Sequence, residues 1–168
     1  MTDPTRHVLF ICTGNSARSI LAEALLNHLG AARFQAHSAG SHPTGSVNPF
    51  ALATLATLGI AADGVRSKNW DEFAQDSTHA GAPTFDFIFT VCDAAAGEVC
   101  PFWPGHPVTA HWGLPDPAAV TGSDHDKARA FLDVAVTLKR RIELLLALPP
   151  QALEGLAAQG HLTHIGQS

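Results

Sequence analysis

The chain has 168 residues, of which 46% are hydrophobic and 15% charged, and its formal net charge is -5. This length predicts a single domain over residues 1–168, and the acidic balance without a basic block argues against a nucleic-acid partner. No apolar run approaches the 18 residues of a membrane span, and the N-terminal MTDPTRHVLF lacks the apolar core of a signal peptide, so we expect a cytoplasmic protein with no membrane partner.

The first half of the chain alternates short apolar runs with amphipathic segments. Asn48 has the chemistry of a helix N-cap and Pro49 that of a first helical residue, while Gly30 and Gly59 supply helix stops. The pattern predicts strands at 7–11 and 34–38, helices at 19–29 and 49–58, and a short helix at 70–74.

The second half continues the alternation. It predicts strands at 85–92 and 106–112 and a long helix at 124–148, which Pro149 and Pro150 end. Strands alternating with helices indicate an α/β fold in which helices cover both faces of a parallel sheet. We expect a core over residues 7–148, a surface appendage at 149–168, and a solvated face at Lys139, Arg140 and Arg141.

A cysteine ends the first predicted strand, just where a helix begins. The segment CTGNSARS, residues 12–19, places five small or polar residues between Cys12 and Arg18. A loop of this length can point successive N–H groups at one anion, and Gly14 permits the backbone angles that this requires. The oxyanion-binding loop would then comprise Thr13, Gly14, Asn15, Ser16, Ala17 and Arg18.

The same surroundings favour a reactive sulfur. A cysteine at a helix N-terminus beside an arginine can have a pKa lowered from about 8.5 to roughly 3.5–7.5. Ser19 can donate a hydrogen bond to that sulfur, and the Asn15 amide can hold the loop in shape. Cys12 is therefore a candidate nucleophile toward a bound oxyanion, with a buried structural cysteine before an ordinary helix as the alternative.

Four motifs in the same order resemble the low-molecular-weight protein tyrosine phosphatase superfamily, which includes the thiol-coupled arsenate reductases. They are FICTGNSARS, SAGSHPTGSVNP, FTVC and HWGLPDPA, between about His7 and Leu146. The resemblance implies a three-layer α/β fold with a four-stranded parallel sheet and helices on both faces. It also implies that Asp116 is the general acid, on a loop after the last strand.

The other two cysteines, in CDAAAGEVCPFWPG, resemble the arsenate reductase branch. By that resemblance Cys12 attacks arsenate, Cys92 attacks Cys12 and releases arsenite, and Cys100 attacks Cys92. The resemblance implies no tightly bound cofactor and reduction by thioredoxin or by glutathione and glutaredoxin. A helix over residues 92–100 would hold its ends about 12 Å apart, too far for a disulfide, so we expect residues 93–99 to refold on oxidation.

Two alternatives remain. The first is a phosphatase that forms a phosphoenzyme on Cys12, although Ala118 and Ala119 stand where the family's phosphatases carry aromatic residues. The second is a zinc protein that uses the run C-x7-C-x5-H-x4-H, from Cys92 to His111. The cysteine spacing exceeds that of common zinc sites, so we expect no metal site.

Overall fold

The computed structural model describes residues 5–73, 84–92 and 107–168. These residues include a four-stranded, all-parallel sheet with strand order β2-β1-β3-β4. The strands are β1 (Arg6–Cys12), β2 (Phe34–Gly40), β3 (Phe87–Thr90) and β4 (Val108–His111). The predicted three-layer α/β fold with a four-stranded parallel sheet is confirmed.

Helices follow the strands as the sequence predicts. The α-helices are α1 (Arg18–Leu29), α2 (Pro49–Thr57), α4 (Asp124–Ala147) and α5 (Gly155–Ile165), and the 3-10 helices are η1 (Trp70–Phe73), η2 (Pro117–Ala119) and η3 (Pro150–Leu153). Asn48 caps α2 by accepting a hydrogen bond from Phe50 N, and Pro49 is its first residue, as predicted. Ser123 forms a capping box with Asp126 at the start of α4.

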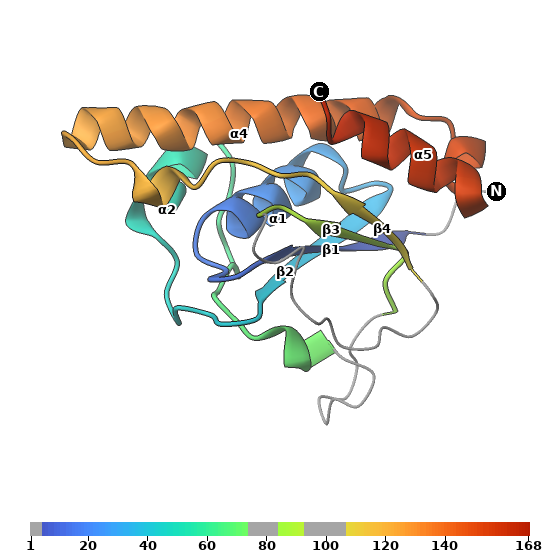
Figure 1. Cartoon of the computed structure of the whole chain (residues 1–168), viewed down its shortest axis with the longest axis horizontal. Helices are drawn as coiled ribbons and strands as arrows, with labels where there is room; N and C mark the ends of the chain where they lie inside the picture. Colours follow the sequence, from blue (N-terminus) through green and yellow to red (C-terminus); the bar gives the residue numbers. More distant parts are fainter. Residues whose placement is uncertain (1–4, 74–83, 93–106) are drawn as a thin grey trace.

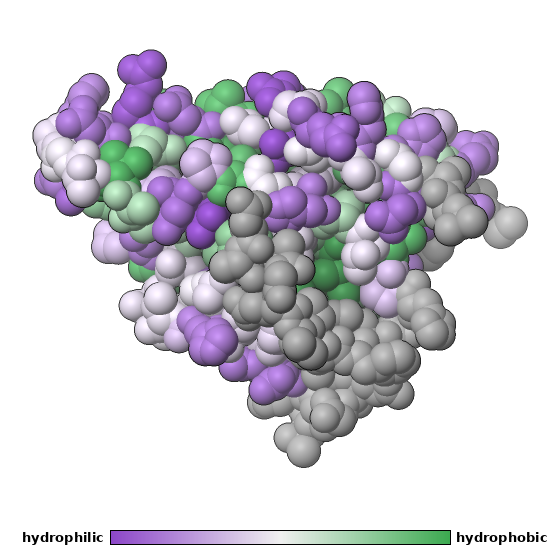
Figure 2. Space-filling model, viewed as in Figure 1, coloured by the Kyte–Doolittle hydropathy of each residue, from purple (hydrophilic) through white to green (hydrophobic). Residues whose placement is uncertain are grey.

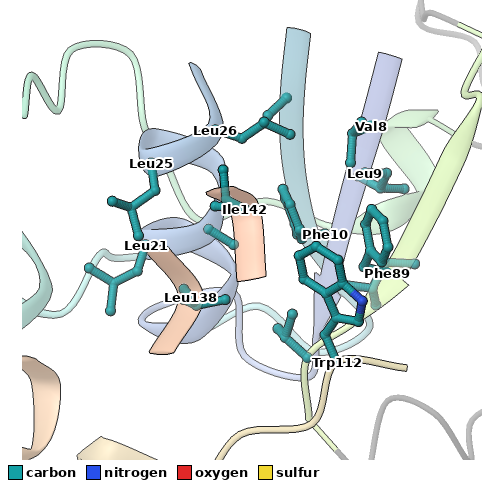
Figure 3. Packing of buried hydrophobic residues seen from close by; sticks show 14 of the residues in the cluster. Val8, Leu9, Phe10, Leu21, Leu25, Leu26, Phe89, Trp112, Leu138 and Ile142 are labelled. Atoms are coloured by element: carbon teal, nitrogen blue, oxygen red, sulfur yellow. The ribbon is translucent and has the colours of Figure 1, made fainter. Parts of the chain in front are cut away.

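Different helices pack against the two faces of the sheet. On one face, α1 lies between the sheet and α4, while η1 lies on the opposite side (Figure 1). Phe10, Phe89 and Trp112 form an aromatic cluster on the α4 side, with the Phe89 and Trp112 ring centroids 4.1 Å apart. Leu138 and Ile142 of α4 extend toward the same core (Figure 3). Dense packing of this kind fixes where each strand ends, and therefore where the loops begin.

The C-terminal tail is part of this core, which corrects the prediction of a surface appendage. Helix α5 contacts β4 and α4, and its residues Ala158 and Leu162 are fully buried. The indole Nε1 of Trp112 donates a 2.9 Å hydrogen bond to the Leu162 carbonyl. Strand β4 is one of the two edge strands of the sheet, and α5 packs against it.

Arg141 is also buried, contrary to the predicted solvated face. Its guanidinium donates to the carbonyls of Gly113 at 3.1 Å and Ser168 at 3.2 Å, so it joins α4 to the loop after β4 and to the tail. Lys139 and Arg140 are exposed as expected. Hydrophilic side chains lie along the outer surface of α4 (Figure 2). No helix in the described part of the chain is long and apolar enough to cross a membrane.

Candidate active site

The predicted oxyanion loop lies at the carboxyl end of the central strand β1. Cys12 is the last residue of β1, and Arg18 is the first residue of α1. Gly40, at the end of β2, pairs with Cys12 and leaves no room for a side chain, because a Cβ there would collide with the backbone oxygens of Cys12 and Thr13. The loop therefore packs closely against the neighbouring strand. Sequence reasoning missed Gly40, although its place in the SAGSHPTG turn was a signal.

The loop turns its carbonyl groups away from its centre. The Thr13, Gly14 and Ser16 oxygens accept backbone hydrogen bonds from the segment 42–48, at 2.9 to 3.0 Å. Within the described residues, the N–H groups of Asn15 and Ser16 have no acceptor in the protein. Among the described residues, no side chain caps the N-terminus of α1, whose positive end adjoins these two N–H groups. This arrangement suits an anion.

Asn15 holds the loop in shape, as its amide was expected to do. It is fully buried and has φ 46°, in the left-handed region that asparagine tolerates better than most residues. Its Oδ1 accepts from Lys68 N at 2.9 Å, and its Nδ2 donates to Ser19 Oγ at 2.8 Å. The Ser19 oxygen is thus an acceptor for Asn15, and in the described part of the chain Ser19 makes no hydrogen bond to the Cys12 sulfur.

The fold brings a second thiol to Cys12. Cys92 follows β3, on the neighbouring strand of the sheet, and both sulfurs are buried, with 4% and 2% of each residue exposed. The Cys92 side chain lies beside that of Cys12 and affects its ionisation. The Thr13 N–H also donates to Cys92 Sγ at 3.3 Å, and the Thr13 hydroxyl lies 3.6 Å from it. Sequence reasoning did not give Thr13 this role, which depends on how two strands end side by side.

The pKa of Cys12 is raised, not lowered as the sequence alone predicted. The interaction with the Cys92 side chain is the main cause and burial the second, while Arg18 and the Gly14 N–H act in the opposite direction. Two thiols in contact titrate as a coupled pair in two separate steps, because the first negative charge opposes the second ionisation. We interpret the raised pKa as that second ionisation. Arg18 and the Gly14 N–H favour negative charge on Cys12, but Cys92 and burial together oppose it more strongly.

Arg18 connects the oxyanion loop to the loop that carries Asp116. Its Nη1 donates to the Leu114 carbonyl at 3.0 Å, and its Nη2 lies 3.8 Å from Asp116 Oδ2. The other oxygen of Asp116 accepts from Ala118 N at 3.0 Å and so caps η2. Asp116 is half exposed beside the oxyanion loop, where a general acid can meet both a substrate oxygen and water.

Some predictions lie outside the described residues. Cys100 and His106 lie outside the described residues, as do residues 93–99, which we expected to refold on oxidation. The described residues contain no cluster of three or more His, Cys, Asp or Glu side chains that could hold a metal ion. The described part of the zinc alternative is Cys92 and His111, and the His111 Nδ1 lies 2.7 Å from the Thr90 hydroxyl.

The fold and the loop between Cys12 and Arg18 define an α/β protein of the phosphotyrosine phosphatase class. Residues 7–158 match the family described as low molecular weight phosphotyrosine protein phosphatase. The chain belongs to this family. The predicted membership of the superfamily is thereby confirmed.

Arsenate reductases are among the relatives of the chain. The chain is 32% identical over 136 residues to the arsenate reductase of Halalkalibacterium halodurans, covering 81% of this chain and 91% of that protein. It is 34% identical over 137 residues to the Bacillus licheniformis arsenate reductase, with the same coverage.

Two solved arsenate reductases also share its structure. One, in the phosphate-binding state, superposes with TM-score 0.67 at 28% identity and covers 85% of this chain and 98% of its own. The thioredoxin-dependent arsenate reductase of Corynebacterium glutamicum has TM-score 0.56 at 27% identity, over 86% of this chain and 65% of its own.

Proposed function

We propose that the protein is an arsenate reductase that converts arsenate to arsenite through a Cys12 adduct. The observation that carries this proposal is the contact between Cys12 and Cys92 beside the oxyanion loop. Hydrolysis of a phosphate ester needs one thiol and water, whereas reduction of arsenic(V) needs two electrons, which a pair of thiols supplies by becoming a disulfide. The arsenate reductases among its relatives support the same reaction.

The first step is substitution at arsenic. The N–H groups of the oxyanion loop and the Arg18 guanidinium bind arsenate and place it against the Cys12 sulfur. The Cys12 thiolate forms a bond to arsenic, and one hydroxyl group of the arsenate leaves as water after Asp116 donates a proton to it. No electrons have yet been transferred to arsenic at this stage.

The second step is the reduction. The Cys92 thiolate attacks the Cys12 sulfur, and the electron pair of the sulfur–arsenic bond moves to arsenic, which leaves as arsenite. A Cys12–Cys92 disulfide remains. The N–H of Thr13, which donates to Cys92 Sγ, helps this sulfur to carry negative charge.

The third step regenerates the nucleophile. The Cys100 thiolate attacks the Cys92 sulfur, which frees the Cys12 thiolate and forms a Cys92–Cys100 disulfide. Two thiol groups of an external donor then reduce that disulfide by thiol–disulfide exchange. We propose thioredoxin or glutathione with glutaredoxin as the donor, in the cytoplasm, where such donors keep thiols reduced. The thioredoxin-dependent Corynebacterium relative supports the first of these donors.

The test is steady-state arsenate reduction by the wild-type protein, with thioredoxin or glutaredoxin as the donor, and by the Cys92→Ser and Cys100→Ser variants. We expect turnover with at least one donor in the wild type and loss of turnover in both variants. Turnover in both variants at the wild-type rate would contradict the relay.

A second activity, hydrolysis of aryl phosphates, is favoured by the position of Asp116 beside Arg18. Phosphate and arsenate share their shape and charge, so the same loop binds both. The Cys92→Ser variant distinguishes the two activities, because it should retain hydrolysis and lose reduction. Rapid hydrolysis in the wild type with no reduction by any donor would make the phosphatase reaction the main one.

A further inference from the structure

A pair of opposite charges lies buried behind the oxyanion loop. Lys68 and Glu23 are 8% and 9% exposed, and the Lys68 Nζ lies 3.7 Å from Glu23 Oε1. Nζ also donates to the Arg66 carbonyl at 2.8 Å, while Glu23 Oε1 accepts from the fully buried Ser38 hydroxyl at 2.5 Å. The steps proposed above use neither charge.

Burial of such a pair is not explained by stability. Taking two charges out of water costs several kcal/mol each, and apolar residues of similar size often serve as well or better. The pKa values of both residues reflect this cost. Burial raises the pKa of Glu23 and lowers that of Lys68, and the attraction between the two charges opposes both shifts. Because a buried pair of this kind adds little stability, its role is to hold part of the chain in place.

The backbone of Lys68 contacts both the oxyanion loop and the end of β2. Its N–H donates to Asn15 Oδ1 at 2.9 Å, and its carbonyl accepts from Gly40 N at 2.9 Å. Next to it, the Ser67 hydroxyl donates to the Gly14 carbonyl at 3.2 Å. Residues 67 and 68 thus bridge the oxyanion loop and the end of β2, and the Lys68 side chain fastens this bridge to Glu23 of α1.

We propose that Lys68 is a positioning residue for the oxyanion loop. Its ammonium, held between the Glu23 carboxylate and the Arg66 carbonyl, fixes segment 66–69. The Lys68 N–H therefore keeps Asn15 in its left-handed conformation, with the neighbouring N–H groups directed at the anion. This inference rests on the proposed binding of a tetrahedral oxyanion, but it does not depend on the reduction of arsenate.

The test measures binding of inorganic phosphate by titration calorimetry, so that no turnover is needed. The informative variant is Lys68→Met with Glu23→Gln, which removes both charges at similar volume and keeps an acceptor for the Ser38 hydroxyl. The Glu23→Gln single variant keeps the ammonium. Arg129→Met is the matched control, because it breaks an arginine–aspartate pair that is 71% exposed on α4.

We expect the double variant to bind phosphate about tenfold more weakly than the wild type, which is the loss typical of one charge-assisted hydrogen bond. Glu23→Gln should stay within about threefold of the wild type, since a charge-assisted bond to the Arg66 carbonyl remains. The Arg129→Met control should be unchanged. In the double variant the amide NMR signal of Asn15 should also move before any ligand is added, and KM for arsenate should rise more than kcat falls.

A folded double variant that binds phosphate within twofold of the wild type would overturn the proposal, because Lys68 would then only neutralise Glu23. Should that variant fail to fold, Lys68→Gln with Glu23→Gln provides a second neutral pair with the same expected result. Wild-type protein that binds phosphate but does not reduce arsenate would refute the proposed function and leave this test intact.

Discussion

The contact between Cys12 and Cys92 predicts that the two thiols cannot both ionise at moderate pH. The two side chains interact, and both residues are nearly fully buried. As a general scale, two unit charges about 4 Å apart repel by about 4 kcal/mol at an effective dielectric constant of about 20. At about 1.4 kcal/mol per pH unit, this repulsion separates the two ionisations by about three pH units.

Thiolate absorbance near 240 nm measures this coupling directly. In a Cys100→Ser background, the protein should form one thiolate in its first alkaline step and the second only far later. The further variants Cys92→Ala and Cys12→Ala should each titrate one thiol, to full amplitude. Denatured protein, the control, should ionise both thiols near pH 8.5. Two thiolates forming together in the folded protein would refute the coupling, and with it the interpretation of the raised pKa of Cys12.

Three further predictions concern the fold around the site. Arg141→Met should lower the free energy of unfolding by about 2–3 kcal/mol, because two buried hydrogen bonds from a charged group are lost. Arg140→Met, at the exposed neighbouring residue, should change it little. Equal melting temperatures of these two variants would contradict the role of Arg141. Burial lowers the pKa of His37 to about 4, so between pH 4 and 6.5 the unfolded chain binds a proton that the folded chain does not bind. Urea denaturation should therefore show the free energy of unfolding falling by about 2 kcal/mol, after allowance for solvent screening, as the pH drops from about 6.5 to 4. If His37→Phe kept the wild-type dependence of stability on pH, this assignment to His37 would be wrong. Gly40→Ala should abolish phosphate binding in calorimetry by displacing the oxyanion loop. Gly160→Ala, where a Cβ meets no described atom within 4 Å, should bind normally; normal binding by both would show that the close approach at Gly40 is not required.

The local elements could be predicted because their signals are local. The buried strand before Cys12, the Asn48 cap with Pro49, and the prolines after α4 each act within a few residues. The side-by-side placement of Cys12 and Cys92 also followed, because parallel strands bring their carboxyl ends to one edge of a sheet.

The burial of Arg141, the docking of the tail and the raised pKa of Cys12 depend on contacts between residues far apart in the sequence. Arg141 belongs to a run of three basic residues that looks solvated, and only the folded chain brings the Gly113 carbonyl to it. The docking of the tail depends on the Trp112 indole reaching Leu162, fifty residues later. The raised pKa of Cys12 likewise follows from a partner eighty residues away, which the CTGNSARS motif does not reveal.

The central claim is that two thiols in contact deliver two electrons to one bound oxyanion. A single-turnover experiment tests it most directly: fully reduced protein receives excess arsenate without any external reductant. Arsenite and free thiols are then counted after quenching, and the disulfides are mapped by mass spectrometry. The account predicts one arsenite per protein, the loss of two thiols and no arsenite from Cys12→Ser or Cys92→Ser. Arsenite formed by the Cys92→Ser variant, or no arsenite from the wild type despite bound arsenate, would contradict it.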